Sequence, residues 1–92
     1  MTDKLEDDRK AIDAIDAKMA VLFEERFKIV ADIISYKIEN QMPILDSNRE
    51  AEITEKNCRR IEDEDIRTYY RKYFSELLKF SREYQKQIQD EK

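Results

Sequence analysis

The feature that most constrains the fold is a stretch from about Lys4 to Glu39 that contains neither proline nor glycine. Its apolar residues recur at spacings of three and four, which is typical of one face of a helix. They are Leu5, Ile12, Ile15, Met19, Leu22, Phe23, Ile29, Val30, Ile33 and Tyr36. At 1.5 Å per residue, the predicted helix is about 50 Å long.

Two shorter helices are expected after the loop at 40–45, where the chain's only proline, Pro43, stops helix propagation. The first starts near Asp46 or Ser47, either of which can cap it, and Ser47 with Glu50 forms a capping-box pattern; it continues to about Ile61. The acidic run at 62–65 suits a new helix start. The third helix is expected from about Ile66 to Gln89, with a stripe of Ile66, Tyr69/Tyr70, Tyr73, Leu77, Phe80, Tyr84 and Ile88.

The pattern contains no repeat and no strand signal, so we predict an all-α chain with one very long, one short and one medium helix, forming a single domain over 1–92. A helix of about 50 Å outruns its shorter partners and leaves part of its apolar face in water. A second copy of the chain can cover that face, so we expect an intertwined helical homodimer. A long antiparallel coiled coil without a binding site is the alternative.

Composition excludes several kinds of site. The chain has no glycine and no histidine, which argues against phosphate-cradling loops and removes the commonest general base and metal ligand. The single Cys58 cannot form an internal disulfide, and it is expected to be an inert helix residue. A net charge of −4 does not favour nucleic-acid binding. With no signal peptide and no apolar run of about 20 residues, we expect a cytoplasmic protein with no membrane partner and no metal.

Polar residues interrupt the apolar stripes. Arg26 falls in line with the stripe of the long helix, and Lys37 lies eleven residues on, which places both on one face about 16 Å apart. Arg9 lies about 100° off that face and is expected to reach a pocket of a partner chain instead. Ser81 and Gln85 continue the stripe of the third helix and need hydrogen-bond partners if they are buried.

Each of these residues has an ordinary structural interpretation. An arginine in a stripe usually extends to water, a buried serine or glutamine is usually hydrogen-bonded, and Arg49–Glu50 is usually a solvated pair with a cap. Together, however, they direct several cations and neutral polar groups toward one interior. Buried cations without counter-charges are costly, so the combination predicts a bound anion.

The sequence resembles the AroQ-class, all-helical chorismate mutases over nearly the whole chain. The resemblance rests on RKAIDAIDAKMAVLFEERFKIVADIISYK at 9–37, PILDSNRE at 43–50 and SELLKFSREYQ at 75–85. It implies a dimer of three-helix chains that rearranges chorismate to prephenate without a cofactor. A unimolecular pericyclic reaction needs no nucleophile or general base, and the dicarboxylate substrate accounts for the inward cations.

The resemblance also implies roles for particular residues. Arg26 and the partner's Arg9 bind the carboxylates, Lys37 donates to a carboxylate and to the ether oxygen, and Gln85 gives that oxygen a second hydrogen bond. Glu50 accepts from the substrate hydroxyl, with help from the backbone near Asp46. Arg49 supports the carboxylate end, and Ser81 makes a polar contact. Lys37, Gln85 and Arg26 are thus the expected catalytic residues.

Two alternatives stay open at this stage. An isochorismate pyruvate-lyase shares the fold and the cationic site, although a glutamate at position 50 suits the chorismate hydroxyl better. A non-catalytic helical dimerisation or regulatory module of the same fold has no reason to keep the polar residues described above.

Overall fold

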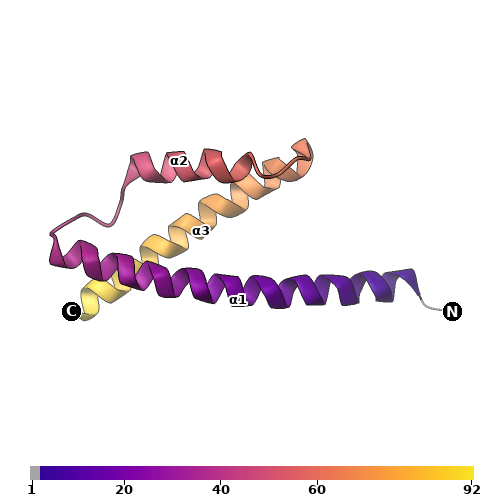
Figure 1. Ribbon diagram of the computed structural model, residues 1–92, viewed down its shortest axis with the longest axis horizontal. Coiled ribbons are helices and arrows are strands. Elements are labelled where there is room, and N and C mark those ends of the chain that lie inside the picture. The colour runs from indigo at the N-terminus through magenta and orange to yellow at the C-terminus, as the bar shows by residue number, and fades with distance from the viewer. Residues whose placement is uncertain (1–2) are drawn as a thin grey trace.

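The structure is a computed structural model that describes residues 3–92, and over this range it contains three helices and no strand. They are α1 (Lys4–Glu39), α2 (Ser47–Cys58) and α3 (Glu64–Glu91). Figure 1 shows α3 running obliquely between the other two, and it packs against both α1 and α2. The N-terminal half of α1 extends beyond the other helices. The all-α prediction with one long, one short and one medium helix is confirmed.

Each helix begins at an aspartate whose carboxylate accepts a hydrogen bond from a backbone N–H of the first turn. Asp3 accepts from Leu5, Asp46 accepts from Arg49, and Asp63 accepts from Ile66. Such caps satisfy donors that have no partner within the helix. Because Asp63 is the cap, α3 starts two residues before the expected Ile66.

The second helix is shorter than predicted, because it ends at Cys58 and not near Ile61. The Arg67 guanidinium donates to the carbonyl of Ile61, with Nε at 2.9 Å and Nη2 at 2.6 Å. These bonds hold the chain in the turn between α2 and α3. Cys58 itself is buried, with 1% of its surface exposed.

The core lies where α3 crosses its two neighbours, and it is formed by Phe74, Leu77 and Leu78 with Phe27, Ile53 and Tyr70 packed against them. Of the predicted stripe on α3, Tyr70 and Leu77 belong to this core, whereas Ile66, Tyr69, Tyr73 and Phe80 are exposed in the single chain. Because α3 crosses obliquely between α1 and α2, it buries the face that both neighbours can contact. About the helix axis, that face is rotated away from the face that carries most of the aromatic side chains.

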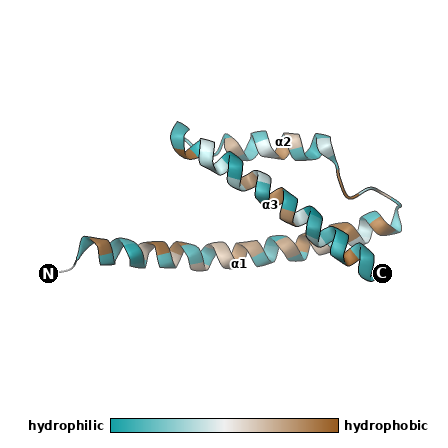
Figure 2. Cartoon of the chain, turned by 180° about the vertical axis from the view of Figure 1, so that it is seen from behind, coloured by the Kyte–Doolittle hydropathy of each residue, from teal (hydrophilic) through white to brown (hydrophobic). Residues whose placement is uncertain are grey.

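The long helix leaves much of its apolar stripe uncovered. Leu5, Ile12, Ile15 and Leu22 each expose more than half of their surface, and Figure 2 shows hydrophobic residues along the extended half of α1. The radius of gyration is 17.0 Å, whereas a globular chain of 92 residues has about 12 Å. No helix within residues 3–92 is both long enough and apolar enough to cross a bilayer.

Candidate active site

The C-terminus of α1 sets the position of Lys37. The helix ends in a Schellman motif, in which Met42 N–H donates to the Lys37 carbonyl at 2.8 Å and Gln41 N–H to the Ile38 carbonyl at 3.3 Å. Gln41 has φ 54°, in the left-handed region that glycine usually occupies at the end of a helix. The chain has no glycine, so a glutamine takes this position. The loop then folds back, so that Lys37 Nζ donates to the carbonyl of Ile44 at 2.7 Å.

Two polar residues meet between α1 and α3. Arg26 Nη1 donates to the hydroxyl oxygen of Ser81 at 2.8 Å, and this hydroxyl donates to the Leu77 carbonyl at 3.0 Å. Ser81 is only 5% exposed, while Arg26 is half-buried. The serine in the apolar stripe thus fixes one end of the guanidinium, and the other nitrogens of Arg26 remain available as donors.

The start of α2 contributes three residues. The carboxylate of Asp46 caps the helix by accepting from Arg49 N–H at 3.0 Å, so the capping box predicted for Ser47 and Glu50 does not form. The Glu50 carboxylate instead pairs with the guanidinium of Arg82 on α3. Arg49 is exposed, and its Nη1 lies 3.5 Å from Glu52, which is a weak contact.

Gln85, one turn beyond Ser81 on α3, has an unusual environment. The residue is 7% exposed, and its side-chain oxygen Oε1 is buried without a hydrogen-bond partner in the described part of the chain. Nearly all buried polar groups in proteins are paired. Oε1 is an acceptor, so its missing partner is a donor group such as a hydroxyl, and the NH₂ group of the same amide is a donor.

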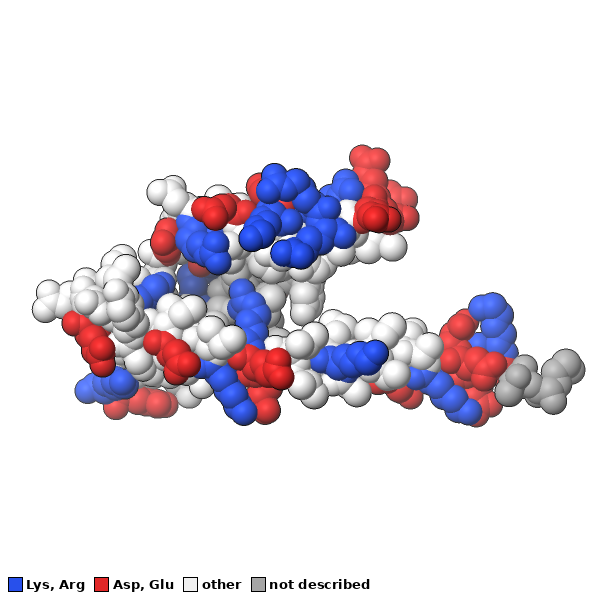
Figure 3. Space-filling model, in the orientation of Figure 1, with Lys and Arg blue, Asp and Glu red and all other residues white. Residues whose placement is uncertain are grey.

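These residues surround one cavity of about 280 Å³, with apolar walls from Val30, Ile33, Ile44, Ile53 and Leu78. Seven of the eight predicted site residues line it: Arg26, Lys37, Asp46, Arg49, Glu50, Ser81 and Gln85. Arg9 does not line it, because its side chain lies on the extended half of α1. Figure 3 shows the molecule hollowed between α2 and α1, with Lys and Arg atoms at the wall of the hollow.

The electrostatics of this cavity favour an anion. It has three cationic and two acidic side chains, and one of the acids, Glu50, is already paired with Arg82. Within residues 3–92, Arg26 and Lys37 hydrogen-bond only to neutral oxygens, although both are half-buried. Charged donors bind carboxylates more strongly than neutral acceptors. The cavity can therefore bind a small carboxylate and direct further donors at it.

Comparison with known protein families matches residues 8–86 to chorismate mutase type II. The chain belongs to the chorismate mutase type II family. Comparisons with curated proteins and with solved structures gave no match. Membership in the chorismate mutase type II family confirms the resemblance found in the sequence, and it supports chorismate mutase activity, an isomerisation.

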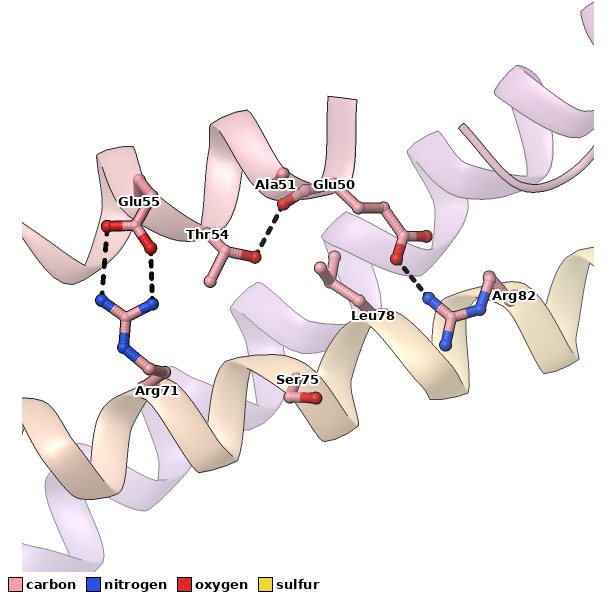
Figure 4. Close-up of a pocket in the computed structure, with 8 residues that line it drawn as sticks. All are labelled: Glu50, Ala51, Thr54, Glu55, Arg71, Ser75, Leu78 and Arg82. Atoms are coloured by element: carbon pink, nitrogen blue, oxygen red, sulfur yellow. Dashed lines mark hydrogen bonds and ion pairs between the residues drawn. The ribbon is translucent and has the colours of Figure 1, made fainter. Parts of the chain in front are cut away.

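Sequence reasoning missed two groups around this candidate site. One is the backbone carbonyl of Ile44, whose position depends on the fold of the loop. The other is Arg82, which pairs with Glu50 and lines a second cavity of about 370 Å³ between α2 and α3 (Figure 4). A lone arginine on a helix is usually solvated, so the sequence offered little reason to place Arg82 near the site. The only signal was that Arg82 directly follows Ser81.

Proposed function

We propose that this chain is a chorismate mutase, which rearranges chorismate to prephenate in the cavity between the three helices. The observation that carries the proposal is that Arg26 and Lys37 lie half-buried beside one cavity and have only neutral partners among the described residues. A dicarboxylate supplies the negative charge that these cations lack. The family match supports the same substrate.

The proposed mechanism uses position and charge without acid–base or covalent steps. In the substrate, the ether C–O bond breaks as a new C–C bond forms within the same molecule, so no atom is gained or lost. Arg26 binds a carboxylate and holds the compact conformer that the rearrangement requires. Lys37 contacts a carboxylate and, with the Gln85 amide, donates to the ether oxygen, where negative charge develops.

The remaining residues complete the substrate contacts. Glu50 accepts from the ring hydroxyl, with help from the backbone near Asp46. Arg49, which is exposed at the rim, adds positive charge at the carboxylate end. Ser81 makes a polar contact with the substrate while it orients Arg26.

The decisive experiment adds purified protein to chorismate and follows loss of chorismate and formation of prephenate. We expect catalysis by the unmodified chain and a loss of at least 100-fold in kcat for Lys37→Ala, since a single donor to developing charge contributes about 10²–10³. Lys28→Ala on the same helix is the matched control, because Lys28 is exposed. No rate above the uncatalysed reaction would rule out the proposed function, and a fully active Lys37→Ala would refute the role of this lysine.

We further propose that the working form is a homodimer. The single chain exposes 7647 Å², whereas a monomer of 11.2 kDa exposes about 5,700 Å². The excess of about 2,000 Å² exceeds the roughly 800 Å² per partner that a stable interface needs. A third cavity, of about 450 Å³, adjoins the candidate site and shares Arg26 and Arg49 with it. A partner's α1 seated here brings Arg9 to the substrate.

Subunit exchange tests this arrangement. Arg9→Ala and Lys37→Ala chains are each expected to be nearly inactive as homodimers. In a heterodimer, one of the two sites then combines an intact Lys37 with an intact Arg9 from the other chain. Mixing is therefore expected to restore activity in about half of the heterodimer sites. No recovery, despite exchange shown by mass spectrometry, would mean that Arg9 does not act across the interface.

A further inference from the structure

Two arginine–glutamate pairs join α2 to α3, and both line the same cavity between these helices (Figure 4). Arg71 pairs with Glu55, and Arg82 pairs with Glu50. The residue types, the helices and the cavity are the same for the two pairs. They differ in position: Glu55 lines this cavity alone, whereas Glu50 also lines the candidate active site.

The geometry of the two pairs differs as well. Arg71 binds Glu55 through both carboxylate oxygens, from Nη1 at 2.6 Å and from Nη2 at 3.4 Å. Arg82 contacts Glu50 through Nη1 and Oε1 alone, and no donor among residues 3–92 bonds to Oε2 of Glu50. One oxygen of Glu50 is thus held by the protein, and the second remains an acceptor without a partner.

The pair that reaches the active site is also the more buried one. The side chains of Glu50 and Arg82 are 24% and 34% exposed, against 59% and 46% for Glu55 and Arg71. Solvent and salt screen an exposed pair more strongly than a half-buried one. The contact between Arg82 and Glu50 is therefore less screened by solvent than the outer pair, although it uses a single carboxylate oxygen.

We propose that Arg82 is a positioning residue for substrate recognition: it anchors one carboxylate oxygen of Glu50 so that the other accepts from the ring hydroxyl of the substrate. This inference rests on the proposed function. A free glutamate has three rotatable bonds, and binding must order it. Anchoring it beforehand removes that cost, which corresponds to a factor of about ten in affinity.

The proposal predicts a change in substrate affinity and specificity. Arg82→Met is expected to raise KM for chorismate about tenfold and to change kcat by less than about threefold, because Glu50 contacts the hydroxyl and not the breaking bond. The preference for chorismate over an analogue without the ring hydroxyl is expected to fall by a similar factor. Arg82→Lys keeps the charge and is expected to recover most of the affinity.

Arg71→Met is the matched control, because it breaks the equivalent pair without touching a residue of the candidate site. It is expected to leave KM and the preference for the hydroxyl unchanged. If Arg82 only joins the helices, both methionine variants lose thermal stability alike and neither changes KM. If the wild type is active and the two variants behave in this way, the positioning role is overturned and the proposed function stands. An inactive wild type would overturn both.

A readout independent of activity comes from the thermal unfolding of Glu50→Gln, Arg82→Met and the double variant. The losses of stability are expected to be non-additive, since each single change breaks the same contact. Additive losses would show that the pair does not form in solution and would overturn the proposal. Arg82→Gln gives the same kinetic test if the methionine variant fails to fold.

Discussion

Replacing Gln85 by methionine tests whether the chain keeps a costly group for its function. Gln85 is 7% exposed, and its Oε1 is buried without a partner. Methionine has a similar length and flexibility but no amide, so Gln85→Met removes the unpaired acceptor without opening a cavity. We expect this variant to be more stable than the wild type and far less active.

The magnitude follows from the burial of the amide. A buried acceptor without a hydrogen bond costs about 1–3 kcal/mol. Removing this cost while keeping the volume is expected to stabilise the fold by about 1–2 kcal/mol. For a domain of this size, each kcal/mol raises Tm by roughly 4–8 °C. Loss of a donor to the ether oxygen is expected to lower kcat by about 10²–10³.

The assay is thermal unfolding followed by circular dichroism at one fixed protein concentration, because dimerisation makes Tm depend on concentration. Gln87→Met on the same helix is the control. Its amide is exposed and makes only a 3.3 Å contact with Glu91, so the stability is expected to change by less than about 0.5 kcal/mol. A Gln85→Met variant that melts several degrees below the wild type would mean that the amide is a satisfied structural group, and the reasoning would be refuted.

Three further predictions use the same protein. Gln85→Glu is expected to be active only at acidic pH, where the protonated carboxyl donates to the ether oxygen as the amide does, and a flat pH–rate profile would contradict that role. Gln41→Gly is expected to raise Tm by a few degrees without changing kcat, because glycine adopts φ 54° without the cost that a side chain brings, and equal or lower stability would argue against strain at this turn. Burial raises the pKa of the Tyr70 hydroxyl above 10.0, so the stability it contributes is present below pH 10 and is lost as pH rises toward the pKa of the folded state. Tyr70→Phe is therefore expected to lose less stability than the wild type between pH 9 and 11 in thermal melts, and identical slopes would be the contrary result.

The local features of this chain follow from sequence alone. The bounds of α1, the loop with Pro43 and the start of α2 at Asp46 or Ser47 were all predicted, because capping, proline and periodicity act over a few residues. The position of Arg26 and Lys37 on one face follows from the same periodicity. Both line the cavity in the folded chain.

The features that depend on contacts between helices could not be predicted in this way. Ser47 and Glu50 match the sequence pattern of a capping box, yet the Glu50 carboxylate pairs with Arg82, which lies 32 residues away. Likewise, the most aromatic face of α3 is not its buried one, since two crossing helices select which face is covered.

The sequence by itself therefore determined where the helices lie and which polar side chains share a face, because helix geometry repeats with a fixed period. Tertiary structure alone decided how α3 is rotated, how deeply Gln85 is buried and where the Glu50 carboxylate goes. These depend on the angle and contact of helices far apart in the chain, and no local periodicity specifies those.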